Sequence, residues 1–106
     1  MNQIASVLKL NVANEANALI MDEHVKQLNA KMIGHPGFVR TNRYVCKSEW
    51  AYELSFLFKD IDSFKAWKTC AIRDDVHATY LEALKKIDVA EDKVYAGARV
   101  YDEFTA

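Results

Sequence analysis

The sequence predicts an α+β domain in which a four-stranded antiparallel sheet carries two helices on one face. Four segments alternate apolar and polar residues with a period of two, as strands with one buried face do. Between them, helical segments place apolar residues at steps of three and four. The order along the 106-residue chain is strand, helix, strand, strand, helix, strand. Two right-handed crossovers joined by a hairpin give this order a ferredoxin-like βαββαβ topology.

The first strand is predicted over residues 4–12, and the first helix follows it. Asn14 is a suitable N-cap because its side-chain oxygen can accept a hydrogen bond from an amide of the first turn. Gly34 and the pair Pro36-Gly37 end the helix, since glycine favours the left-handed conformation and proline cannot continue a helix. Five apolar residues mark the buried face of this helix: Ala18, Met21, Val25, Leu28 and Met32.

The second half of the chain begins with two strands, predicted over residues 38–46 and 51–59 and joined by a short connection as a hairpin. Asp60 or Asp62 can cap a second helical region, which opens with Ser63-Phe64-Lys65-Ala66-Trp67. The apolar pattern weakens afterwards, so three further segments are predicted: an irregular turn over 70–74, a helix over 75–87 and a last strand over 92–101.

Composition excludes several classes of protein. The formal net charge of −1 provides no electrostatic basis for binding nucleic acid or an anionic membrane. Two cysteines, Cys46 and Cys70, are too few for a disulfide scaffold and show no zinc-ligand spacing, so we expect reduced thiols. The first residues lack the pattern of a signal peptide, and no apolar run could span a bilayer. A cytoplasmic protein is therefore expected.

The face of the sheet opposite the helices is predicted to mediate dimerisation. Its expected apolar residues would leave a large exposed patch on a monomer, and such patches usually mark interfaces. A symmetric homodimer with sheet packed on sheet would cover it. The residues expected on this face are Val7, Val39, Val45, Leu57, Tyr95 and Tyr101, mixed with Arg43, Ser55 and Arg99.

Two motifs resemble those of a known family. The turn Gly34-His35-Pro36-Gly37-Phe38 opens the second strand, and Ser63-Phe64-Lys65-Ala66 opens the second helix. Both are similar to the antibiotic biosynthesis monooxygenase (ABM) group of the dimeric α+β barrel superfamily. The resemblance covers residues 4–101, so residues 1–106 are expected to form a single ABM-like domain. It implies the fold more strongly than the activity, because the superfamily includes monooxygenases, haem-degrading enzymes, isomerases and proteins without assigned chemistry.

The resemblance also implies candidate site residues. It favours an oxygenase that acts on a small, flat, mostly apolar aromatic or quinone-like molecule without a metal cofactor. Trp67 and His77 are the candidate catalytic residues. Tyr80, Asn42 and Tyr44 are the candidate substrate-binding residues.

Two other functions stay open. Trp67 followed ten positions later by His77 resembles the haem-degrading branch, in which a histidine binds the iron, although the stretch Ser6–Lys9 lacks that branch's asparagine. A haem-binding or haem-degrading protein with His77 as axial ligand is therefore one alternative. A non-catalytic small-molecule-binding or interaction module is the other. Trp67 and His77 could also be ordinary packing residues, and His24 and His35 are expected to face solvent.

Overall fold

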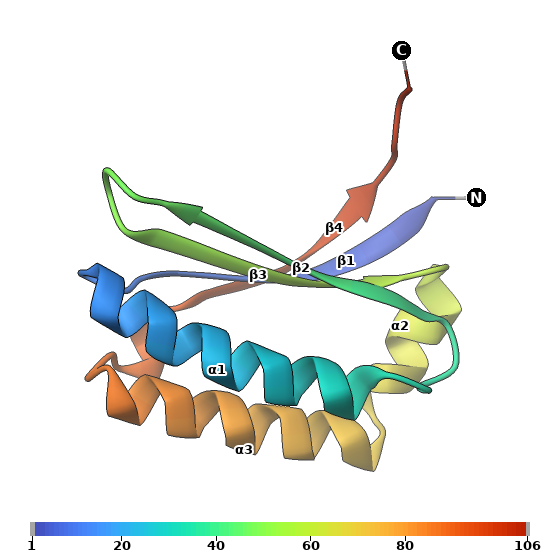
Figure 1. The fold of residues 1–106 in the computed structure, drawn as a ribbon. Coiled ribbons are helices and arrows are strands. Elements are labelled where there is room, and N and C mark those ends of the chain that lie inside the picture. Colours follow the sequence, from blue (N-terminus) through green and yellow to red (C-terminus); the bar gives the residue numbers. More distant parts are fainter. Residues whose placement is uncertain (1, 106) are drawn as a thin grey trace.

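The computed structural model describes residues 2–105 and confirms the predicted ferredoxin-like α+β fold (Figure 1). Four antiparallel strands form one sheet in the order β2-β3-β1-β4, and the helices cover one face of it. No helix among the described residues is long and apolar enough to cross a membrane. The elements in chain order are β1 (Gln3–Asn11), α1 (Glu15–Met32), β2 (Phe38–Cys46), β3 (Ala51–Phe58), α2 (Ile61–Lys68), α3 (Ala71–Lys86), a 3-10 turn (Glu91–Lys93) and β4 (Tyr95–Tyr101).

Local side-chain chemistry sets the helix boundaries. The Asn14 side chain accepts a hydrogen bond from the Asn17 amide at 2.8 Å and caps α1, as predicted. Of the two candidate caps for α2, Asp60 is the one used, because it accepts from the Ser63 amide at 2.8 Å. The predicted irregular turn is shorter than expected: α2 ends at Lys68, and α3 already begins at Ala71. The sheet therefore carries three α-helices on its covered face, and the break between two of them adjoins the cavity described below.

The core lies between the sheet and the helices. Strand β3 points Tyr52, Leu54, Phe56 and Phe58 toward the helices, and all four side chains are buried. The predicted stripe of α1 packs against them, with Ala18, Met21, Leu28 and Met32 buried. Helices α1 and α3 lie side by side under the sheet (Figure 1). Burial of these apolar side chains is the main stabilising term of the fold.

Strand β2 departs from simple alternation because it contains a β-bulge. Phe38 pairs with Phe58, whereas Arg40 pairs with Leu57, so Val39 is an extra residue on one strand. After the bulge, each residue of β2 points to the opposite face of the sheet from the one that simple alternation predicts. The prediction that Arg43 and Val45 lie on the open face is therefore wrong: Arg43 reaches α1, and Val45 packs against the core.

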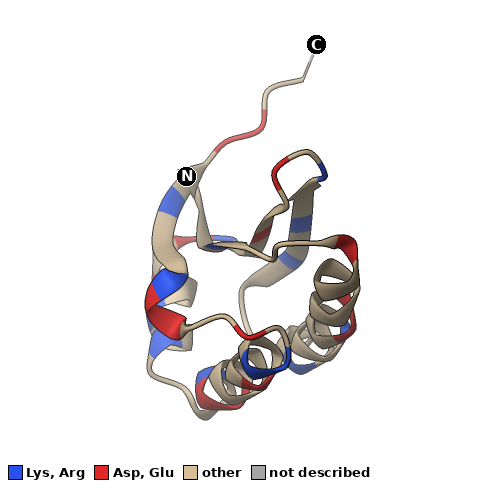
Figure 2. Ribbon diagram, turned by 90° about the vertical axis from the view of Figure 1, so that its left-hand side faces the viewer, with Lys and Arg blue, Asp and Glu red and all other residues tan. Residues whose placement is uncertain are grey.

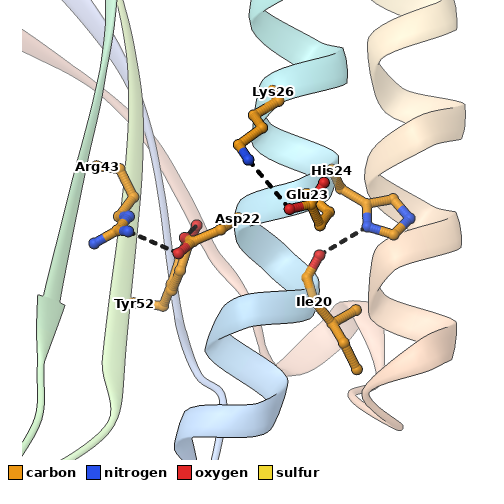
Figure 3. A network of polar contacts seen from close by, with 7 residues as sticks. All are labelled: Ile20, Asp22, Glu23, His24, Lys26, Arg43 and Tyr52. Carbon is orange, nitrogen blue, oxygen red and sulfur yellow. Dashed lines mark hydrogen bonds and ion pairs between the residues drawn. The ribbon is translucent and has the colours of Figure 1, made fainter.

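A polar network joins α1 to the sheet beside this bulged strand (Figure 3). The Asp22 carboxylate accepts a hydrogen bond from the Tyr52 hydroxyl and one from the Arg43 guanidinium, each at 2.7 Å. Burial, followed by the hydrogen bond and the negative charge of Asp22, raises the pKa of the Tyr52 phenol strongly. Tyr52 therefore stays protonated and donates to Asp22 throughout the physiological pH range.

The expectation that His24 and His35 face solvent is wrong. His24 is only 3% exposed and lies on the side of α1 that faces α3 (Figure 3). Its Nδ1 lies 2.9 Å from the Ile20 carbonyl oxygen, which can only accept, so Nδ1 carries the proton. His35 is half-buried, and its ring packs edge-on against Phe58 with centroids 6.3 Å apart. Both imidazoles serve as packing groups, and each leaves a buried Nε2 without a partner among the described residues.

The open face of the sheet differs from the predicted apolar patch. Val7 and Leu57, which lie at its centre, are 4% and 0% exposed within a single subunit. Long side chains from the edges of the sheet cover them: Arg40 of β2 donates to the Tyr101 hydroxyl of β4 at 3.0 Å and lies over its ring. The outer layer of this face is thus made of arginine and tyrosine side chains, with a small apolar cluster beneath.

Candidate functional site

A cavity of about 260 Å³ lies between the sheet and the helices α2 and α3. Small side chains explain why the space is unfilled. In the β1–β4 pairing, Ser6 lies opposite Ala98 and Leu8 lies opposite Ala96, so three of these four positions carry little volume. Apolar atoms dominate the wall, which suits an apolar ligand. The lining residues are Ser6, Leu8, Leu28, Leu54, Phe56, Phe64, Trp67, Lys68, Arg73, Val76, His77, Tyr80, Ala96, Gly97 and Ala98.

Trp67 forms an aromatic wall of the cavity. It is 6% exposed, and its ring centroid lies 5.3 Å from that of Phe58 and 5.9 Å from that of Phe56. Phe64, one helical turn earlier, stacks on it at 6.4 Å. The indole Nε1–H is buried and has no hydrogen-bond partner among the described residues. Buried tryptophan donors usually find an acceptor, so this unpaired group is unusual.

His77 lies at the mouth of the cavity and is held from two sides. Its Nε2 is 2.8 Å from Glu91 Oε2, and its ring stacks on Tyr80 with centroids 5.8 Å apart. An ionised carboxylate can only accept, so Nε2 carries the proton in this pair. Nδ1 is therefore the ring nitrogen that remains available to accept a proton, and Glu91 fixes the tautomer.

Tyr80 lies beside His77 in the lining of the cavity. Its side chain is 6% exposed, and no described residue hydrogen-bonds its hydroxyl. Burial, with a smaller contribution from the Glu91 charge, raises the pKa of the phenol. The hydroxyl therefore keeps its proton at neutral pH and is a free hydrogen-bond donor at the cavity.

The structure brings together three of the five predicted site residues. Trp67, His77 and Tyr80 line one cavity, whereas Asn42 and Tyr44 do not. Asn42 pairs with Ser55 and Tyr44 pairs with Glu53, so both point to the opposite face of the sheet, where Asn42 contacts Arg40. The bulge in β2 and the strict alternation after it place them there.

Sequence reasoning missed Glu91 and the small residues of β4. Glu91 is 14 residues from His77, in a 3-10 turn that brings it back to α3, and no spacing rule predicts that contact. The run Ala96-Gly97-Ala98 was a detectable signal, because three small residues in a row inside a predicted strand leave space on the packed face. Among the described residues, no group of three histidine, cysteine or acidic side chains could hold a metal ion.

Comparison with known proteins identifies structural relatives at low sequence identity. No family model matches the sequence, and no curated protein matches it. Several solved structures are similar to it, and three of them are described in the next paragraph.

One is a monooxygenase from the gene ActVA-Orf6 of Streptomyces coelicolor in complex with Nanaomycin D, with a TM-score of 0.72, 12% identity and coverage of 99% of this chain and 92% of that one. SnoaB, a cofactor-independent oxygenase from Streptomyces nogalater, has a TM-score of 0.64 and 14% identity, and the match covers 100% of this chain and 97% of SnoaB. A dimeric ferredoxin-like protein of unknown function from Jannaschia sp. has a TM-score of 0.66, 11% identity and coverage of 92% and 97%. At these identities the likeness shows the fold, and the chain has the ABM-like α+β fold to which these oxygenases belong.

Proposed function

We propose that the protein is a cofactor-free oxygenase that acts on a small, flat, mostly apolar aromatic or quinone-like molecule. The observation that carries the proposal is the juxtaposition, in one apolar cavity, of an aromatic wall and a histidine oriented by a carboxylate. A base positioned by a third group is the arrangement that proton abstraction requires. The fold supports the proposal, since one similar structure is that of a cofactor-independent oxygenase.

The chemistry needs little from the protein beyond binding and proton transfer. A substrate with an acidic CH₂ group flanked by aromatic rings loses a proton to His77 Nδ1 and becomes a delocalised carbanion. The carbanion transfers electrons to O₂ and forms a C–O bond, giving a peroxide. The peroxide takes up the proton and eliminates water, so one oxygen atom becomes the product carbonyl and the other leaves in water.

The remaining residues of the cavity would bind and polarise the substrate. Trp67 would form the apolar wall against the flat substrate, and the Tyr80 hydroxyl would donate to the developing oxyanion. Tyr80 is suited to this role because its raised pKa keeps the phenol protonated. Asn42 and Tyr44 have no part in this proposal, because they lie on the other face of the sheet.

Haem fits the site poorly. The Nε2 atom of His77, the candidate iron ligand, is already hydrogen-bonded to Glu91 at 2.8 Å. At about 260 Å³ the cavity is also close to the lower end of the range of roughly 300–1,000 Å³ that is usual for ligand pockets, a size that suits a small aromatic molecule better than a porphyrin. A porphyrin with iron on His77 would therefore require the Glu91 contact to break and the helices to part. No step of the proposed reaction involves haem.

We also propose that residues 1–106 form one domain that pairs as a homodimer through the open face of the sheet. Tyr44 and Tyr95 of that face are 66% and 51% exposed, and Arg40 and Arg99 lie over tyrosine rings. Tyrosine and arginine are enriched in protein interfaces, so this layer suits a partner even though the apolar centre is already covered. A dimeric relative of the same fold supports the pairing. The cytoplasmic location stays a prediction.

Oxygen uptake with anthrone as the probe tests the proposed function. We expect uptake of one O₂ for each anthraquinone formed, and a loss of about 10²-fold or more in His77→Ala, in the range that general-base catalysis contributes. Ala98→Leu should abolish turnover by filling the cavity, whereas Ala66→Leu, on the exposed side of α2, should not. Tight anthrone binding with no oxygen uptake above the uncatalysed rate would instead identify a non-catalytic binding module. A Soret band that saturates at one haem per subunit and is lost in His77→Ala would favour the haem alternative.

A further inference from the structure

The mouth of the cavity is basic, although the protein as a whole is not. Apart from Tyr80, the ionisable side chains that line the cavity are Lys68, Arg73 and His77, and no aspartate or glutamate is among the lining residues. All three basic side chains lie in the exposed part of α2 and α3, at the rim. The formal net charge of −1, by contrast, gives no general attraction for anions. Figure 2 shows basic and acidic segments interspersed along the helices, so the excess of positive charge is local.

Two of these cations are not balanced by a neighbouring carboxylate. His77 is paired with Glu91, which offsets its charge when it is protonated. Lys68 lies over the Phe64 ring, with Nζ 5.4 Å from the centroid, and forms no ion pair within residues 2–105. Arg73 likewise forms none in the described chain, although Asp74 and Asp75 follow it directly in the sequence.

Only some of the other basic side chains in residues 2–105 are paired with a carboxylate, so what distinguishes the rim is its place at a cavity whose lining holds no aspartate or glutamate. Ion pairs join Lys9 to Glu53, Lys26 to Glu23, Arg43 to Asp22 and Lys86 to Glu82. The two unbalanced cations thus lie on either side of the break between α2 and α3, at the edge of the apolar cavity. An apolar pocket with a cationic rim is complementary to a molecule that has an aromatic body and an anionic group at one end.

We infer that the cavity selects aromatic carboxylates, with the ring system against Trp67 and the carboxylate at Lys68 and Arg73. This inference rests on the proposed function for the identity of the site and adds the charge of the ligand. An arginine fork can hold a carboxylate with two parallel hydrogen bonds, whereas lysine contributes a point charge. Each exposed ion pair contributes up to roughly fivefold in affinity, so two give at most about 25-fold, and pairs of intermediate strength give a preference of about five- to tenfold over a neutral analogue.

Calorimetric titration with two matched probes tests the inference. 2-Naphthoate carries the carboxylate, and 2-acetonaphthone has a neutral acetyl group on the same ring system. The wild-type protein should bind 2-naphthoate about five- to tenfold more tightly at low salt, and the preference should shrink at high salt because exposed charges are screened. The double variant Lys68→Met/Arg73→Met should bind both probes with equal affinity. Lys65→Met, which removes an exposed lysine of α2 outside the cavity, should keep the preference.

The outcomes separate this inference from the proposed function. Equal binding of both probes to the wild-type protein overturns the anionic preference but leaves an apolar cavity that can still oxygenate anthrone. A preference that persists in the double variant places the anion elsewhere and also overturns the inference. Binding of neither probe overturns the ligand site itself. A further comparison uses Lys68→Met/Arg73→Lys, which keeps a positive charge at position 73, and Lys68→Met/Arg73→Met, which does not. If the lysine variant recovers most of the preference for 2-naphthoate, the carboxylate is recognised by charge.

Discussion

The turn between α1 and β2 offers a sharp test of how α2, and with it Trp67, is positioned. Gly34 and Gly37 both have positive φ angles, of 91° and 84°, so alanine at either position is strained. Their surroundings differ. A Cβ at Gly34 meets nothing within 4 Å, whereas a Cβ at Gly37 would be forced onto the Oγ and Cβ atoms of Ser63 in the first turn of α2. The two alanine variants therefore share the backbone strain and differ only in the contact.

The expected free energies follow from that difference. Gly34→Ala should lower the free energy of unfolding by about 1–2 kcal/mol, the cost of a left-handed residue with a side chain. Gly37→Ala should lose the same amount plus about 1–3 kcal/mol for overpacking against Ser63. The Gly37 carbonyl also accepts a hydrogen bond from the Lys59 amide at 2.8 Å, which keeps the turn from moving away freely. The difference corresponds to roughly 4–8 °C in Tm for each kcal/mol in a domain of this size.

Urea unfolding of both variants measures this difference, with the free energy obtained from the midpoint and the slope. Ser63→Gly in the Gly37→Ala background should recover part of the loss, because it removes both clashing atoms. Two results would refute the argument that a side chain at position 37 clashes with Ser63 of α2. One is equal destabilisation by Gly34→Ala and Gly37→Ala, and the other is a Gly37→Ala/Ser63→Gly variant whose losses simply add. Turnover should follow the same order, since displacement of α2 also moves Trp67.

Two other predictions concern the polar groups that hold the helices. Tyr52→Phe should lower the free energy of unfolding by about 1.5–3 kcal/mol, because the buried hydroxyl donates to the charged Asp22; urea unfolding checks this, and an unchanged midpoint would contradict it. The hydrogen bonds from Ser63 lower the pKa of Asp60 below its usual 3.8. The charged cap therefore stabilises the folded state fully at pH values above the unfolded-state pKa of this carboxyl group. That contribution is lost as the pH falls through the lower folded-state pKa. Asp60→Asn, which keeps an acceptor but cannot titrate, should therefore lose less stability than the wild-type protein between pH 5 and pH 2 in acid-unfolding curves.

Much of the fold follows from local patterns in the sequence. The cap Asn14, the helix end at Gly34 and the alternation of β3 each depend on a few neighbouring residues, so they can be predicted without knowledge of the rest of the chain. For α2 the sequence narrowed the cap to Asp60 or Asp62, and the structure uses Asp60. The order of strands and helices then leaves few topologies. Trp67, His77 and Tyr80 could be grouped in advance because they lie on consecutive helical segments that pack on the same face of the sheet.

Other features depended on contacts between distant segments, which only the tertiary structure decided. The bulge at Val39 depends on how β2 pairs with β3, and it reversed the faces of Arg43 and Val45. His24 is buried because α3 packs over it, which no property of α1 alone reveals.

The site shows the same division. Sequence pattern by itself supplied the aromatic and imidazole groups. The cavity exists because small residues of β1 and β4 face each other across a strand pairing, and Glu91 fixes His77 because a turn folds back onto α3. Periodicity reports which side of its own element a residue occupies. Packing decides which residue of another element that residue contacts. This contact depends on the strand register and on how the side-chain volumes of the whole core fit together.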